Sequence, residues 1–157
     1  MKINGCASVF NVVDQHNECV LQGAFLNSID LDEIKMKYEH DLEIDGKWEV
    51  IREKSNNQLW VEGYITKCKQ NKELINKIEK GEIKGLSIGC YVKKSYLDIE
   101  NNIRYFFELT LNEISLVEKP ANLWANFMPK IKLDIGAIMM QKNKKTNIKG
   151  NIYDKFK

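Results

Sequence analysis

The sequence lacks the features that mark secreted, membrane, disulfide-linked and zinc-binding proteins. Its first ten residues, MKINGCASVF, do not have the basic-then-apolar order of a signal peptide, and no apolar run approaches the roughly 18 residues needed to cross a bilayer. The four cysteines are scattered at positions 6, 19, 68 and 90, without a C-x-x-C pair or Cys/His clustering. We therefore expect a soluble, unsecreted protein with reduced cysteines, no zinc site and no membrane partner.

The composition is that of an ordinary globular domain. The chain has 157 residues, of which 43% are hydrophobic and 29% charged. Its net charge of +2 is uneven, because residues 141–157 hold six lysines against one aspartate. We expect one domain over 1–128 and a flexible, solvated basic tail over 129–157. Such a tail can bind nucleic acid, but no stripe of aromatic and basic residues supports nucleic acid as a partner.

The hydrophobic pattern predicts mostly strands. Alternation of apolar with small or charged residues indicates strands over 3–10, 46–53, 58–66, 86–97, 103–119 and 125–133. Two short helices are predicted, one beginning near Ser28 within 28–41, with acids in its first turn, and one over 71–81 that ends on a glycine. We expect a mainly β, α+β domain, either a small barrel or a sandwich.

A serine lies between two glycines in the stretch KGEIKGLSIGCYV (80–92). The letters GLSIG (85–89) match the G-x-S-x-G nucleophile elbow of α/β hydrolases, but that motif needs a strand before the serine and a helix after it. Here the predicted order is reversed, and no histidine lies downstream. The α/β-hydrolase interpretation is therefore excluded. Ser87 remains either a nucleophile or a small residue at a tight backbone approach.

A serine nucleophile needs a neighbouring base, and the chain has only two histidines. His40 ends a predicted helical segment beside Asp41, at a junction where a side chain can face a cleft. His16 lies in the polar turn 14–18, where a solvated surface position is the simplest interpretation. We favour His40 as the base, and an ordinary structural histidine is the alternative.

Glu113 is the candidate for the group that orients the histidine. It lies in LNEISLV (111–117), where it shares a strand face with apolar residues and Ser115. A carboxylate in such surroundings needs a partner. That partner is either the imidazolium or a basic side chain, for which Arg104 is one candidate. Ser115 is a rival nucleophile but lacks flanking glycines.

Four blocks of the sequence, taken in order, resemble the prohead (head maturation) proteases of tailed bacteriophages. They are GCASVFNVVDQHNECVLQGAF (5–25), YEHD (38–41), the helix followed by GLSIG (72–89) and LNEISLVEKPANLWA (111–125). Four ordered blocks are much more specific than one short serine motif. The resemblance covers most of the first 128 residues and leaves the tail outside.

This resemblance implies a serine endopeptidase related in fold to herpesvirus assemblins, a small β-barrel flanked by a few short helices. It implies that His40 is the base and Ser87 the nucleophile. Glu113 occupies the place of a second histidine in the herpesvirus proteases and becomes the orienting residue. The KPAN turn (119–122) corresponds to part of the oxyanion hole, so the backbone N–H groups of Ala121 and Asn122 are candidates. No metal or organic cofactor is implied.

The resemblance also implies where the protein acts and on what. Its relatives work inside the procapsid, in the cytoplasm of the bacterial host, on scaffold protein or the scaffolding segment of the major capsid protein, and often on themselves. A homodimer is expected only by analogy with the herpesvirus proteases. The alternative is a non-catalytic procapsid scaffolding or binding module on the same barrel. In that case Ser87 is a packing residue and Glu113 a salt-bridge partner.

Overall fold

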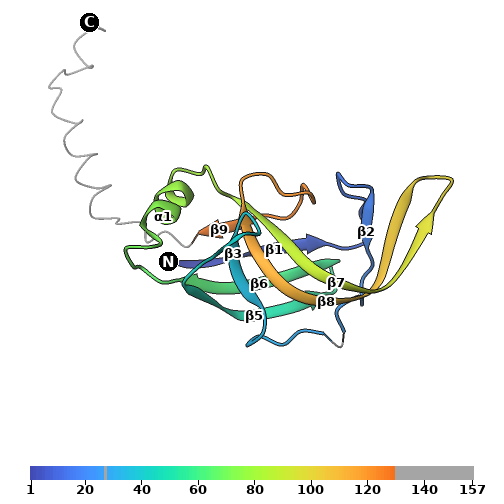
Figure 1. The fold of residues 1–157 in the computed structure, drawn as a ribbon, viewed down its shortest axis with the longest axis horizontal. Helices are drawn as coiled ribbons and strands as arrows, with labels where there is room; N and C mark the ends of the chain where they lie inside the picture. Colours follow the sequence, from blue (N-terminus) through green and yellow to red (C-terminus); the bar gives the residue numbers. More distant parts are fainter. Residues whose placement is uncertain (27, 130–157) are drawn as a thin grey trace, which may run out of the picture.

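The computed structural model of the protein describes residues 1–26 and 28–129, which form mainly β-strands (Figure 1). The strands are β1 (Lys2–Val9), β2 (Glu18–Val20), β3 (Lys35–Tyr38), β4 (Leu42–Glu43), β5 (Gly46–Lys54), β6 (Gln58–Ile65), β7 (Gly85–Asp98), β8 (Ile103–Val117) and β9 (Phe127–Pro129). Within the described residues the one helix is α1 (Lys72–Glu79). Its eight residues are too few to span a membrane, so the described part of the chain has no helix that could cross one. The mainly β, α+β class is therefore confirmed.

The strands form two sheets that share one core. The first has the order β5-β6-β1-β9 and the second the order β2-β8-β3-β4, with β7 paired to β8. Ile114 and Leu116 of β8 are fully buried against side chains of the first sheet, such as Trp48 and Leu59. Face-to-face packing of two apolar sheet faces accounts for most of the hydrophobic stabilisation of such a domain.

The expected closed barrel is not confirmed. The two sheets approach each other where β7 begins, through an isolated bridge between Gly85 and Asn126 and a hydrogen bond of 3.1 Å from Leu86 N to Ala125 O. Among the described residues, no continuous ladder of strands joins the sheets into one closed cylinder. The bridge to β7 comes from Asn126, just before β9, while β9 itself pairs with β1.

The helix predicted within 28–41 is wrong. This segment contains a turn at 31–33 followed by strand β3. The Asp30 carboxylate accepts a hydrogen bond of 3.1 Å from Asp32 N, a local contact that competes with helix formation. Met36 is buried between two lysines that point to the other face, which is strand periodicity rather than helical periodicity.

The second predicted helix is confirmed as α1. It buries Ile75 and Ile78 and ends at Glu79, two residues before Gly81, which has a left-handed φ of 74°. Hydrogen bonds from Gly81 N to Ile78 O and from Glu82 N to Lys77 O close its last turn. The strands expected over 3–10, 46–53, 58–66, 86–97 and 103–119 are also confirmed. The strand expected over 125–133 appears as β9, which ends at Pro129. The basic tail expected over 129–157 lies outside the described residues except for Pro129.

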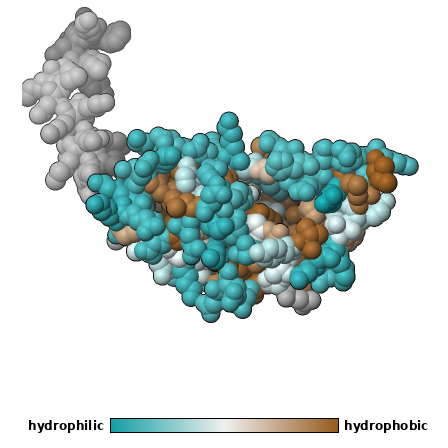
Figure 2. Space-filling view, viewed as in Figure 1, coloured by the Kyte–Doolittle hydropathy of each residue, from teal (hydrophilic) through white to brown (hydrophobic). Residues whose placement is uncertain are grey.

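Strands β7 and β8 are much longer than the other strands of their sheet. Their far halves form a long arm, drawn in yellow shades in Figure 1, in which β2 also pairs with β8 at Arg104–Phe106. The near halves pack on the core and carry the candidate site residues. Hydrophobic side chains reach the surface toward the end of the arm (Figure 2), where Leu97 and Ile99 are exposed.

Candidate active site

His40 lies in the turn that joins β3 to β4. Asp41 N donates a hydrogen bond of 3.2 Å to Tyr38 O, and the two residues between them, Glu39 and His40, have φ values of 49° and 67°. Left-handed backbone costs a residue with a side chain about 1–2 kcal/mol. Turns of this type normally use Gly, Asn or Asp at such positions. The strain in this turn therefore suggests that the position of the His40 side chain is functionally required.

Three contacts hold this strained turn against β8. Glu39 N donates to Leu116 O at 3.0 Å, and the Glu39 carboxylate accepts a bond of 2.7 Å from Glu118 N. Because β3 runs parallel to β8 with Tyr38 opposite Leu116, the turn begins directly above this end of β8. The third contact comes from His40 itself.

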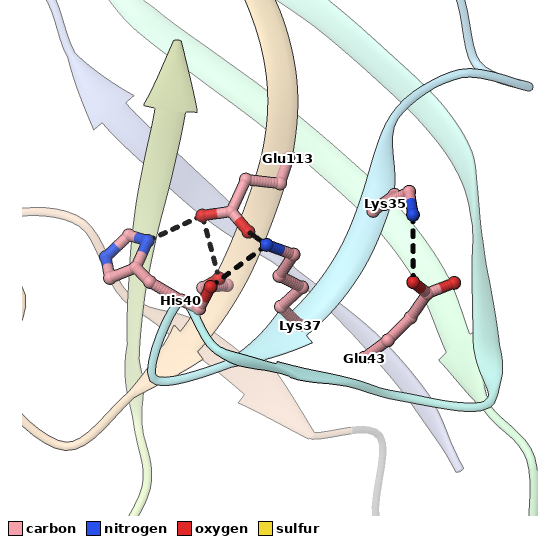
Figure 3. Close-up of polar contacts among 6 residues, drawn as sticks. Lys35, Lys37, His40, Glu43 and Glu113 are labelled. Atoms are coloured by element: carbon pink, nitrogen blue, oxygen red, sulfur yellow. Dashed lines mark hydrogen bonds and ion pairs between the residues drawn. The ribbon is translucent and has the colours of Figure 1, made fainter.

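The His40 imidazole contacts the carboxylate of Glu113, with 2.6 Å between Nδ1 and Oε1 (Figure 3). The Glu113 side chain is 5% exposed and the His40 side chain 44% exposed. A carboxylate only accepts hydrogen bonds, so the proton of the neutral imidazole lies on Nδ1 and the lone pair on Nε2. This tautomer leaves Nε2 able to accept a proton from a third group.

Glu113 has two further polar neighbours. Ser115 Oγ donates a hydrogen bond of 3.2 Å to Oε1. Lys37 Nζ lies 3.0 Å from Oε2, as an ion pair outside hydrogen-bond geometry. The prediction of Arg104 as the basic partner is wrong, because Arg104 lies at the other end of β8.

Gly89 makes room for Glu113. The two residues face each other across the β7–β8 ladder, and a Cβ atom on Gly89 would lie 2.5 Å from Glu113 Cγ and 2.6 Å from Oε1. Real Cβ atoms do not approach other atoms so closely. Gly85 is constrained in the same way, because its Cβ would lie 2.6 Å from the Pro120 ring. Both glycines of GLSIG are therefore packing requirements, and Ser87 lies between them on a strand, which excludes a nucleophile elbow.

Ser87 and His40 line one pocket of about 530 Å³. Ala121 and Asn122 line it as well, so four of the five predicted site residues share its wall and Glu113 lies behind His40. Within the described part of the chain, Ser87 Oγ forms no hydrogen bond to a protein group. Catalytic hydrogen bonds are often long without substrate and tighten when it binds.

The segment 119–122, of which Lys119, Ala121 and Asn122 line this pocket, is held in place by hydrogen bonds. Ala121 O accepts a hydrogen bond of 3.2 Å from Gln15 N, and the Asn122 side-chain amide donates to Val9 O at 3.0 Å. These bonds fix the segment, while the N–H groups of Ala121 and Asn122 donate to no protein acceptor among the described residues. The segment thus has the fixed, unpaired donors that an oxyanion hole requires.

Two further residues, one lining the pocket and one contacting Glu113, were not among the predicted site residues. His16 lines it with an exposed side chain, beside Asp14, whose carboxylate accepts a hydrogen bond of 2.8 Å from His16 N. Lys37 was missed because its segment was interpreted as a helix. The spacing of Lys35 and Lys37 around a buried Met36 was the signal for a strand with both lysines on one face.

Cys90 also lines the pocket, one residue beyond Gly89. Burial, and then the charge of Glu113, raise the pKa of the Cys90 thiol to about 12. The thiolate is the reactive form of cysteine, so Cys90 is a poor nucleophile near neutral pH. Within residues 1–26 and 28–129, no group of three or more His, Cys, Asp or Glu side chains is arranged to hold a metal ion.

Comparisons with known proteins identify a family for this chain. Residues 1–134 match the family described as Caudovirus prohead serine protease. The prohead protease of Enterobacteria phage HK97 is 32% identical over 125 residues, which cover 75% of this chain and 55% of the phage protein. The chain thus spans about half the length of this curated relative. A family match over most of the chain shows that this protein belongs to the Caudovirus prohead serine protease family.

Proposed function

We propose that this protein is a serine endopeptidase of phage head maturation, with Ser87 as nucleophile, His40 as general base and Glu113 as the orienting residue. The observation that carries the proposal is the buried Glu113 carboxylate 2.6 Å from His40 Nδ1, beside a pocket that His40 and Ser87 both line. A histidine held by a buried acid, with its second nitrogen free, is the arrangement that activates a hydroxyl nucleophile.

In the proposed reaction, His40 Nε2 takes the proton of the Ser87 hydroxyl as Oγ forms a bond to the scissile carbonyl carbon. The resulting oxyanion accepts hydrogen bonds from the free N–H groups of Ala121 and Asn122. His40 then gives its proton to the departing amine nitrogen as the C–N bond breaks. Water attacks the acyl-enzyme, and its proton passes through His40 back to Ser87 Oγ.

Glu113 stabilises the imidazolium that forms twice in this cycle. Its charge lies in a buried environment, where the interaction with an opposite charge is stronger than in water. General-base assistance by a positioned histidine is typically worth ~10² to 10⁴ in rate. We therefore expect loss of His40 to lower the cleavage rate severely. Loss of Glu113 should also lower the rate, because Glu113 fixes the tautomer of His40 and stabilises its imidazolium.

The substrate that we propose is the scaffold protein or the scaffolding segment of the major capsid protein, cleaved inside the procapsid. This part of the proposal follows from the family and from the name of the HK97 relative. The pocket supports a polypeptide substrate because it combines apolar walls, such as Phe106 and Leu109, with charged side chains, such as Arg104.

Co-expression with the neighbouring major capsid protein tests this function. We expect the parent protein to shorten the capsid subunit, measured by intact mass, and the Ser87→Ala variant to leave it whole. Ser95→Ala is the matched control, because Ser95 lies on the same strand β7 but is exposed and does not line the pocket. Equal cleavage by the parent and by Ser87→Ala would exclude Ser87. Assembled procapsids with whole subunits in every case would favour a scaffolding module.

A further inference from the structure

Glu113 is a buried carboxylate whose two oxygens are unequally satisfied. Oε1 accepts from His40 and from Ser115, whereas Oε2 is buried and has no hydrogen-bond donor within the described part of the chain. The charge of such a carboxylate is costly to bury unless an opposite charge lies close to it. The neutral imidazole of a resting general base does not supply that charge.

Lys37 supplies it, from the strand next to β8. Its ammonium nitrogen lies 3.0 Å from Glu113 Oε2, and its side chain is 23% exposed. The same nitrogen donates a hydrogen bond of 3.0 Å to the backbone oxygen of His40 (Figure 3). One cation therefore contacts both the orienting carboxylate and the strained residue that carries the imidazole.

The parallel pairing of β3 with β8 explains this reach. Lys37 lies opposite Ser115 and two residues from the position opposite Glu113, and it is three residues before His40. Lys35, on the same face of the same strand, instead pairs with Glu43 at 3.0 Å and is more exposed (Figure 3). The two lysines lie on the same face of β3, but Lys35 contacts Glu43 and Lys37 contacts Glu113.

We propose that Lys37 is a positioning residue for the protease reaction. Its ammonium group neutralises the Glu113 charge and holds the His40 backbone beside Glu113, so that Glu113 stays ionised next to a neutral His40. This inference rests on the proposed function. With Lys37 present, the resting charge of the three groups is zero, and a proton on His40 makes it +1. Without Lys37, the resting charge is −1, and protonation of His40 neutralises it. Lys37 therefore disfavours premature protonation of His40.

Other titratable groups line the pocket beside this site and are the same in the parent and the Lys37 variants. They come from the β1–β2 loop, β2, the β3–β4 turn, β7, the far part of β8 and the segment after β8: Asp14, His16, Glu18, Glu39, Cys90, Arg104 and Lys119. Within the residues described, Lys37 and His40 form ion pairs with Glu113, and none of these other groups does.

The test is the Lys37→Met variant of the full chain, with Lys35→Met as the matched control. His40 is followed through the NMR titration of its imidazole, which is assignable because the chain has only two histidines. The rate of labelling of Ser87 by a fluorophosphonate is measured over pH 5–9. For Lys37→Met we expect the midpoint of the His40 titration and the acid limb of the labelling profile to move together to higher pH, because a neighbouring cation is lost. For Lys35→Met we expect neither to move.

An unchanged His40 titration and an unchanged labelling profile in Lys37→Met would overturn the proposal. A second variant, Lys37→Gln, removes the charge but keeps a donor, and the same rise is expected if Lys37→Met does not fold. Failure of the proposed function gives a different result. The parent protein then forms no fluorophosphonate adduct on Ser87, while its His40 titration can still be measured. In that case the NMR shift alone decides whether Lys37 acts on the pair.

Discussion

Gly89 is the residue on which the position of Glu113 depends most directly. A methyl group there would overlap the Glu113 side chain at 2.5–2.6 Å. In Gly89→Ala we expect the carboxylate to move away from His40 and cleavage of the capsid subunit to fall by about 10²-fold or more, because small displacements at a catalytic site have large effects. The rate of cleavage by purified protein measures this effect.

Gly46→Ala is the control for a general steric effect of alanine. Its Cβ would lie 2.5 Å from Tyr64 O, in a part of the first sheet that does not line the pocket. We expect this variant to lose stability and keep the specific activity of its folded fraction. If Gly89→Ala loses only stability and its folded fraction stays fully active, the role of Gly89 in placing Glu113 is refuted.

Cys90 gives a second prediction at the scale of single residues. With its pKa raised to about 12, roughly one thiol in 10⁴–10⁵ is ionised near pH 7.5. We expect iodoacetamide to leave Cys90 unmodified and Ser87 labelling intact at that pH. Alkylation should accelerate about tenfold per pH unit through pH 10, because the thiolate fraction rises with pH below the raised pKa.

Peptide mapping measures the modification, and the urea-unfolded protein, in which all four cysteines react, is the control for reagent quality. Fast alkylation of Cys90 at pH 7.5 in the folded protein, with loss of labelling at Ser87, would contradict this description of the pocket.

The β3–β4 turn shows at the element scale how local strain and function are linked. His40→Gly and His40→Ala lose the same imidazole and both should be inactive. They differ in backbone, because glycine adopts a φ of 67° without penalty and alanine does not. We expect His40→Gly to be more stable than His40→Ala by about 1 kcal/mol in urea unfolding. Equal stability of the two variants would mean that the turn is not strained at His40.

The same turn shows why one element was mispredicted from sequence. Helix α1 has apolar residues at helical spacing and a glycine stop, and both features are local. Strand β3 has four residues, and the pairing that stabilises it comes from β8, more than 70 positions later in the chain. Acidic residues after Ser28 suggested a helix start, but they form a turn, and tertiary pairing decided the outcome.

The whole molecule brings together residues that are distant in sequence. His40, Ser87 and segment 119–122 line one pocket only because the turn after β3, strand β7 and the end of β8 meet in one sheet. Residue types and the family resemblance were enough to name them in advance. The Lys37 contact with Glu113 could not be predicted, since it depends on the parallel register of β3 against β8.

Removal of residues 135–157 is a test at this largest scale. Every residue of the described core lies at or before Phe127, and the family match ends at residue 134. We expect the protein truncated after residue 134 to unfold cooperatively, with a midpoint within about 3 °C of the parent, as for a surface change of under ~0.5 kcal/mol. We also expect it to label at Ser87 at the parental rate. Loss of cooperative unfolding on calorimetry would contradict the domain boundary.

The most direct test of the proposed triad is the site and rate of reaction with a fluorophosphonate, mapped by mass spectrometry. We predict a single adduct on Ser87 in the parent protein. The rate of its formation should fall by about 10² or more in His40→Ala, and should also fall in Glu113→Gln, while each variant remains folded. An adduct on Ser115, or labelling of Ser87 at the same rate without His40, would contradict the assignment of Ser87, His40 and Glu113.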